Sequence, residues 1–205
     1  MKLLNYTYIS IKTILVGILA LTAFHWCNIV KYADLRLNKY PYTISEVSSH
    51  NYVIDLKTQI TNDTPKYEEL YQFMLSRTSE DKVTFKIYGY GGAVTSAILV
   101  INGIKETKAK VYGYVSSSAY SAHGYITCAI PKTNVKWGTY SYIMLHGVQS
   151  SKKPSKKPSN EMTEASVNRM ITECNDKGYM TPLDANRIMI DNQNEYYYWN
   201  GKKVG

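Results

Sequence analysis

The apolar and polar positions of this chain change period along its length, and each change predicts an element. Between Tyr52 and Thr58 apolar and polar side chains alternate, which predicts a β-strand. Thr64 and Pro65 then stand where an N-cap and a first helical residue are expected. The apolar stripe of the expected helix comprises Tyr67, Leu70, Tyr71, Met74 and Leu75.

The same succession of strand and helix continues along the chain. Val83–Tyr88 predicts a strand that runs into the glycine pair at 91 and 92, and Val111–Val115 predicts a further strand. An apolar segment that ends at Ala129 follows a serine cluster. Strands that alternate with helices predict an α/β fold of βαβ units around a mostly parallel sheet. The helical stripe between the two strands comprises Val94, Ala97, Ile98, Ile101 and Ile104.

The N-terminal part has a different pattern. Residues 13–30, between Lys12 and Lys31, are uncharged and mostly apolar, which is near the lower length limit for a membrane-spanning helix. We expect one transmembrane signal anchor there, with a cleaved signal peptide and a buried core helix as the alternatives. Basic residues flank both ends, so the orientation in the membrane stays open.

The rest of the chain is expected to form one domain. Residues 150–160 repeat Lys-Lys-Pro-Ser and predict a flexible basic loop. A helix is expected from Glu161 to Asn175, and the Tyr-rich tail from Gln193 to Gly205 predicts a terminal strand or hairpin. The predicted organisation is a tail (1–12), the anchor (13–30), a linker (31–47) and the domain (48–205).

Composition narrows the classes of function. The formal net charge is +8, but the basic residues are dispersed apart from Lys152–Lys157, and no nucleic-acid-binding motif accompanies them. We therefore expect no nucleic-acid partner. The three cysteines, Cys27, Cys128 and Cys174, are odd in number and lack metal-ligand spacing. They predict neither a disulfide framework nor a zinc site, and no metal or other cofactor is expected.

Three features between Gly91 and His146 carry candidate chemistry. A glycine pair can be a simple tight turn, but Gly91 and Gly92 would also let backbone N–H groups face a substrate oxygen, as in an oxyanion hole. Ser121 precedes the apolar segment, so the N–H of Ala122 would add to such a hole. His146 closes a strand-like segment, where a histidine is either a core residue or a general base.

These residues resemble the proteolytic subunit of the Clp protease, within the wider Clp/crotonase superfamily. The likeness covers about residues 50–149 and, more loosely, the rest. Ile87–Thr95 resembles the family's Asn-Ser-Pro-Gly-Gly-Ser-Val-Thr turn, and Ala119–Ala122 resembles its Ala-Ala-Ser-Met nucleophile element. Ser141–His146 resembles its Ser-Arg-Val-Met-Ile-His segment. The ungapped separations favour Ser121 as nucleophile over Ser117.

The resemblance implies a Clp/crotonase-like fold and a serine endopeptidase that works through an acyl-enzyme. It implies Ser121 as nucleophile and His146 as base. Tyr179–Ala185 resembles the family's Phe-Leu-Ser-Ala-Pro-Glu-Ala element, so the orienting acid falls on Glu173 or, after a small shift, on Asp176. The implied oxyanion donors are the N–H groups of Gly91, Gly92 and Ala122.

The resemblance also implies partners, and departures from it keep two alternatives open. Implied are a peptide or unfolded-protein substrate, a homo-oligomeric ring and an ATPase unfoldase. Tyr90 replaces the family's proline, and the basic loop occupies its handle region. One alternative is a signal-peptide-peptidase-like enzyme with a Ser–Lys dyad that uses Lys177. The other is a catalytically inactive Clp-like membrane interaction module.

Overall fold

The computed structural model describes residues 41–56, 59–147, 159–190 and 195–204, and from Pro41 onward they belong to one compact unit. The expected anchor over 13–30 lies outside the described residues, as does the basic loop up to residue 158. Within these described ranges no helix is long and apolar enough to cross a membrane.

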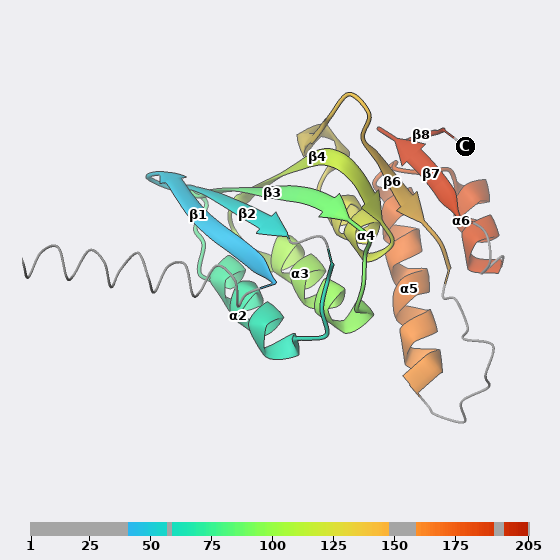
Figure 1. Cartoon of the computed structure of the whole chain (residues 1–205), viewed down its shortest axis with the longest axis horizontal. Coiled ribbons are helices and arrows are strands. Elements are labelled where there is room, and N and C mark those ends of the chain that lie inside the picture. The colour runs from blue at the N-terminus through green and yellow to red at the C-terminus, as the bar shows by residue number, and fades with distance from the viewer. Residues whose placement is uncertain (1–40, 57–58, 148–158, 191–194, 205) are drawn as a thin grey trace, which may run out of the picture. The chain divides into compact units, whose positions relative to one another are not determined.

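An eight-stranded sheet organises the domain, with strand order β1-β2-β3-β4-β6-β7-β8 and β5 paired to β4 (Figure 1). The pairs β2–β3, β3–β4, β4–β5 and β4–β6 are parallel, whereas β1, β7 and β8 pair antiparallel at the edges. The strands are β1 (Tyr42–Ser48), β2 (Asn51–Leu56), β3 (Lys82–Gly89), β4 (Lys110–Tyr120), β5 (Val135–Trp137), β6 (Tyr142–Leu145), β7 (Tyr196–Trp199) and β8 (Lys202–Lys203).

The helices α2, α3 and α5 lie along one side of this sheet (Figure 1). Consecutive parallel strands need crossover connections, and α2 and α3 provide them between β2, β3 and β4. This arrangement confirms the predicted α/β class with a mostly parallel sheet. The helical segments are α2 (Thr64–Leu75), α3 (Val94–Glu106), α4 (Ala122–Ala129), η1 (Lys132–Asn134), α5 (Ser159–Asp176) and α6 (Pro182–Ile190).

Side chains of the central strands alternate between the two faces of the sheet. In β3, Val83, Phe85 and Ile87 are fully buried, whereas Lys82 and Lys86 are exposed. The buried set faces the helices, because period-2 alternation sends every second residue to the same face.

Three local expectations need correction. The N-cap of α2 is Asp63 rather than Thr64, because the Asp63 side chain accepts a hydrogen bond from the Lys66 N–H. Leu75, expected in the buried stripe, is 37% exposed. Part of the predicted linker over 31–47 is strand β1, which pairs with β2.

The C-terminal tail forms the hairpin that was one of its two predicted forms. β7 and β8 pair antiparallel through Asn200 and Gly201. Both residues have positive φ values, 46° and 77°, as a tight two-residue hairpin turn requires. An Asn-Gly pair is the usual sequence for such a turn because both residues tolerate that backbone conformation.

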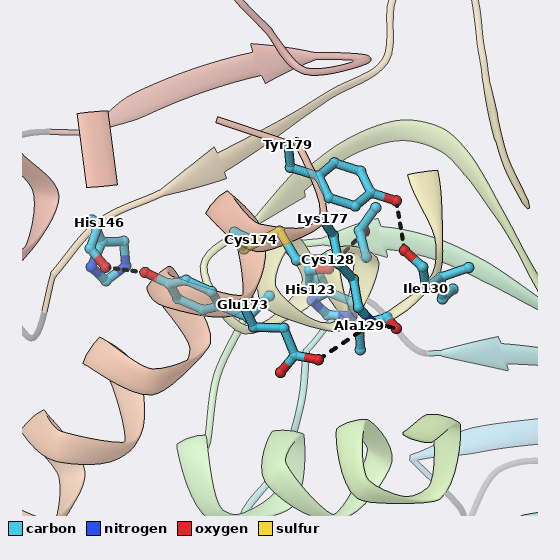
Figure 2. The surroundings of a disulfide bond; sticks show 11 residues. His123, Cys128, Ala129, Ile130, His146, Glu173, Cys174, Lys177 and Tyr179 are labelled. Carbon is cyan, nitrogen blue, oxygen red and sulfur yellow. Dashed lines mark hydrogen bonds and ion pairs between the residues drawn. A yellow bond between two sulfur atoms is a disulfide. The ribbon is translucent and has the colours of Figure 1, made fainter. Parts of the chain in front are cut away.

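The cysteine prediction was wrong. Cys128 at the end of α4 and Cys174 in α5 form a disulfide across a sequence separation of 46 residues (Figure 2). Both side chains are buried where α4 packs against α5. An odd cysteine count does not reveal such a pair, because the helix packing that joins the two residues is a tertiary contact.

Candidate active site

The candidate residues meet at the carboxyl ends of adjacent parallel strands. Tyr120, the last residue of β4, pairs with Met144 of β6. The next residue, Ser121, donates its N–H to the Met144 carbonyl at 2.7 Å. His146 follows β6 directly. The ends of neighbouring parallel strands therefore bring Ser121 and His146 to the same edge of the sheet, which is where α/β proteins usually bind ligands.

Ser121 has an unusual backbone conformation. Its φ is 53° and its ψ is −116°, between the end of β4 and the start of α4. Positive φ in a non-glycine residue is sparsely populated, costs on the order of 1–3 kcal/mol and tends to occur at functional sites. A strained serine at a strand-to-helix turn is also the geometry that exposes the nucleophile in α/β-hydrolases.

Gly91 packs directly against this turn. Its φ is 87°, and a Cβ added there would lie 2.7 Å from the Ser121 Cβ and 2.8 Å from the Tyr120 carbonyl oxygen. The same Cβ would lie 3.0 Å from the Ala122 nitrogen. Only glycine fits this position, so the tight approach of Gly91 to Ser121 explains the first residue of the glycine pair.

Gly92 is held by a different contact. A Cβ there would lie 2.0 Å from the Ile60 carbonyl oxygen, and that oxygen accepts a hydrogen bond from the Ala93 N–H at 2.9 Å. The turn is therefore fixed on one side by Ser121 and on the other by the Ile60 backbone.

His123 fixes the Gly91 turn from inside the protein. This histidine is fully buried in α4, and its Nδ1 accepts a hydrogen bond from the Gly91 N–H at 3.0 Å. An Nδ1 that accepts a hydrogen bond carries no proton, so the ring is neutral with its proton on Nε2. His123 is thus a positioning residue in this structure, and its role was not apparent from the sequence.

The predicted oxyanion donors differ in availability. The Gly91 N–H is already bound to His123. In the described part of the chain, the N–H groups of Gly92 and Ala122 donate no hydrogen bond. Ala122 is the first residue of α4, where backbone N–H groups are free for a ligand.

His146 has the tautomer that a general base needs. Its Nδ1 lies 2.6 Å from the Gly147 carbonyl oxygen, and a carbonyl can only accept, so Nδ1 carries the proton. The lone pair is then on Nε2. The Tyr125 hydroxyl donates to the His146 carbonyl at 2.5 Å. Burial raises the pKa of Tyr125 well above its ordinary value, so this hydroxyl remains a donor.

Within the described residues, Ser121 and His146 are not hydrogen-bonded to each other, and neither predicted acid contacts His146. Glu173 forms ion pairs with Lys105 at 3.2 Å and with Lys177 at 3.3 Å. Figure 2 shows the Glu173 carboxylate directed toward Lys177, with the His146 ring on the other side of the cluster. Asp176 is exposed, and among the described residues its carboxylate accepts a hydrogen bond only from the neighbouring Asn175 side chain.

Lys177 and Ser117, the alternative site residues, lie elsewhere. Lys177 donates to the carbonyl of Ala129 at the C-terminal end of α4 (Figure 2). Ser121 is at the opposite end of that helix, about 12 Å away at 1.5 Å per residue. Ser117 is exposed within β4, where the register with β3 shifts, and does not precede a helix.

The described residues contain no group of three or more side chains that could hold a metal ion. No known family model matches the chain, and no curated protein matches it either. The arrangement combines a strained serine, a helix N-terminus and a histidine with its lone pair on Nε2. Such a set of groups suits acyl transfer from a carbonyl substrate to serine.

Proposed function

We propose that the protein is a serine peptidase related to the Clp/crotonase superfamily, with Ser121 as its nucleophile. The backbone of Ser121 carries this proposal, because a positive φ in a serine at a strand-to-helix turn is costly and exposes the hydroxyl. The close approach of Gly91 supports it, since it is the contact that the resemblance to the family's glycine turn leads one to expect.

In the proposed reaction, the His146 Nε2 accepts the proton of the Ser121 hydroxyl as its oxygen attacks a peptide carbonyl. The N–H groups of Gly92 and Ala122 stabilise the oxyanion. His146 then delivers the proton to the leaving amine, and water hydrolyses the acyl-enzyme. Binding of substrate has to close the gap between Ser121 and His146, as is common for catalytic hydrogen bonds that tighten only in the complex.

The Gly147 carbonyl takes the orienting role in this proposal. It accepts from the His146 Nδ1 and so keeps the lone pair on Nε2, which is the role of the carboxylate in a triad. Glu173 is better explained as the partner of Lys105 and Lys177. The Ser–Lys alternative lacks support, because Lys177 is engaged at the far end of α4.

The disulfide bears on the proposed membrane location. Disulfides persist in oxidising compartments, so we propose that the domain lies on the non-cytosolic side of a membrane, anchored by residues 13–30. The ATPase unfoldase and the homo-oligomeric ring implied by the family resemblance have no support among these observations.

The test is labelling of the detergent-solubilised full chain with a fluorophosphonate, which reacts with activated serines. We expect labelling of the wild type, its loss in Ser121→Ala and His146→Ala, and its retention in Ser117→Ala and Lys177→Ala. Circular dichroism would check that each variant is folded. Absence of labelling in a folded wild type would contradict the proposal and favour a catalytically inactive module. Loss in Lys177→Ala with retention in His146→Ala would favour the Ser–Lys dyad.

A further inference from the structure

Four tyrosines form a continuous row beside the candidate nucleophile. We call Tyr90, Tyr120, Tyr142 and Tyr197 the tyrosine strip. The rings of Tyr90 and Tyr120 are parallel with centroids 6.1 Å apart. Those of Tyr120 and Tyr142 meet edge to face at 5.9 Å, and those of Tyr142 and Tyr197 at 5.5 Å. The row therefore crosses from the glycine turn over β4 and β6 to β7.

The strip begins at the nucleophile itself. Tyr120 precedes Ser121 and Tyr90 precedes Gly91, and these two following residues pack against each other. Tyr142 is opposite Ser118, and Tyr197 is opposite Met144. A polypeptide bound with one carbonyl at Ser121 would therefore have the ring of Tyr90 or Tyr120 within reach of a neighbouring side chain.

The hydroxyl groups of the strip are largely satisfied by one another and by one carboxylate. The Tyr120 and Tyr142 hydroxyls are 2.8 Å apart, and the Tyr197 hydroxyl donates to Glu195 at 2.5 Å. The ring faces are what remains for a ligand. Tyr90 is 77% exposed, so most of this side chain at the nucleophile end is open to solvent.

Elsewhere this protein covers aromatic faces with its own cations. The Arg77 guanidinium lies over the Tyr52 and Phe73 rings, the Lys82 ammonium over Tyr112, and the Lys203 ammonium over Tyr196. Within the described residues no cation lies over a ring of the strip. Glu195, at its far end, forms no ion pair in the same part of the chain. The strip thus offers ring faces and a carboxylate without a compensating cation.

From this geometry we infer that the tyrosine strip selects a substrate polypeptide that carries an arginine side chain close to the bond that Ser121 attacks. Arginine is favoured over lysine because its planar guanidinium stacks on ring faces. The inference rests on the proposed peptidase function. It assigns a substrate class to that site and makes Tyr90 a specificity-determining residue.

Single-stranded nucleic acid is the other polymer that stacks on rows of aromatic rings. Such a ligand needs cations that follow its phosphates, whereas the charged group bound to the strip is the Glu195 carboxylate. Lys203, on the next strand, is engaged with Asp184 and the Tyr196 ring. The polarity of the strip therefore favours a cationic side chain over a polyanion.

The experiment measures peptide binding to the full-length Ser121→Ala variant in detergent, which cannot cleave its ligand. Two fluorescein-labelled peptides differ only by arginine or its uncharged isostere citrulline, in otherwise apolar, extended sequences. We expect the arginine peptide to bind about tenfold more tightly, the order expected for one cation–π contact with a partly desolvated ring. Adding Tyr90→Leu should abolish this preference.

Tyr140→Leu is the matched control, because Tyr140 is 90% exposed but outside the strip, so the preference should persist in that variant. Equal binding of the two peptides would overturn the inference, and so would a preference that survives Tyr90→Leu. Displacement of the arginine peptide by a single-stranded oligonucleotide would assign the strip to nucleic acid. A dimer in light scattering that is lost in Tyr90→Leu would assign the strip to a second copy of the chain.

Fluorophosphonate labelling of the wild type separates the two proposals. Labelling of Ser121 without an arginine preference would overturn the strip's role and leave the peptidase proposal intact. An arginine preference without labelling would contradict the peptidase proposal, and the assignment of the strip to a substrate would fall with it. Only labelling together with a Tyr90-dependent arginine preference supports both.

Discussion

At the scale of single residues, the candidate site depends on one close backbone approach. Ser121 adopts a positive φ because the chain turns sharply from β4 into α4, and Gly91 packs against that turn where no Cβ could fit. His123 holds the Gly91 amide from the buried side. Three residues from two separate segments therefore define the position of the serine hydroxyl.

Replacement of Gly91 by alanine tests this approach. Gly91→Ala introduces a positive-φ alanine and a clash with Ser121 and Tyr120, so we expect a loss of about 3 kcal/mol in the free energy of unfolding and no fluorophosphonate labelling. Gly178→Ala is the control. Its φ is 73°, but a Cβ there has no neighbour within 4 Å, so the loss should be about 1 kcal/mol with labelling intact. Equal losses in urea unfolding would refute the importance of the contact.

Replacement of the two histidines near the site should affect stability and labelling in different ways. His123→Ala leaves the Gly91 N–H without its buried acceptor, so we expect a loss of about 1–3 kcal/mol in unfolding free energy and slower labelling with an unchanged pH profile. His146→Ala should abolish labelling with a smaller effect on stability, because His146 is only half-buried. A labelling rate that follows the reverse pattern would exchange the roles of the two residues.

The lowered pKa of Asp81 predicts that the protein loses stability as the pH falls. Hydrogen bonds from the Thr78 N–H and from His50 lower the pKa of this carboxyl, with the nearby Arg77 charge adding to the effect. A carboxyl whose pKa is lower in the folded state stabilises the fold at pH values above its unfolded pKa of about 3.9. This stabilisation is lost as the pH falls through the folded-state pKa.

Thermal unfolding between pH 3 and pH 7, a window set around the unfolded carboxyl pKa of about 3.9, checks this. Asp81→Asn should lower the melting temperature most at the neutral end, and the difference from wild type should shrink toward the acid end. Asp176→Asn, at an exposed aspartate, should show a smaller difference throughout. A difference for Asp81→Asn that is constant with pH would contradict the assignment.

At the scale of elements, the disulfide joins the helix that begins at the nucleophile to α5. Cys128 is near the end of α4, and Cys174 is one residue from Glu173, which pairs with Lys177 and Lys105 (Figure 2). Lys177 in turn binds the end of α4 through the Ala129 carbonyl. The covalent bond and the polar contacts therefore fasten the same two helices together.

Removal of this bond should destabilise the domain. Closing a loop of 46 residues contributes up to about 4 kcal/mol by the chain-entropy model, and measured values commonly lie at about 2–4 kcal/mol. We expect that loss in urea unfolding of Cys128→Ala/Cys174→Ala, and the same loss for wild type under dithiothreitol. Cys27→Ala is the control, with no expected sensitivity. Unchanged stability of the reduced protein would show that the two cysteines are not bonded in solution.

At the scale of the whole molecule, the disulfide makes a prediction about the compartment of the domain. A domain on the oxidising side of a membrane should retain the bond in intact cells. Alkylation with N-ethylmaleimide before lysis should leave Cys128 and Cys174 unmodified, and alkylation after reduction should modify both, as read by mass spectrometry. Full modification before reduction would locate the domain in a reducing compartment and contradict the proposed orientation.

Local patterns predicted a large part of the fold. The strand around residues 52–56, the strand around 83–88 and the helix from 94 onward follow from side-chain period, because each element buries one face of its own. The spacing of Gly91, Ser121 and His146, which resembles that of the Clp family, singled them out as candidates, but only the structure shows Ser121 and His146 at one edge of the sheet. β1 was missed because a polar edge strand, exposed over its second half, resembles a linker.

Contacts between distant segments were decided only by the tertiary structure. The hydrogen bond from Gly91 to His123, the bond between Cys128 and Cys174 and the alignment of the tyrosine strip each join residues from different elements. Glu173 looked like a triad acid by its position in the chain, but its direction in the fold pairs it with lysines. The sequence by itself determined most of the segments that form strands and helices, because side-chain period depends on neighbours along the chain. Which residues of different elements contact each other depended on how the helices pack against one side of the sheet. Local periodicity carries no information about that packing.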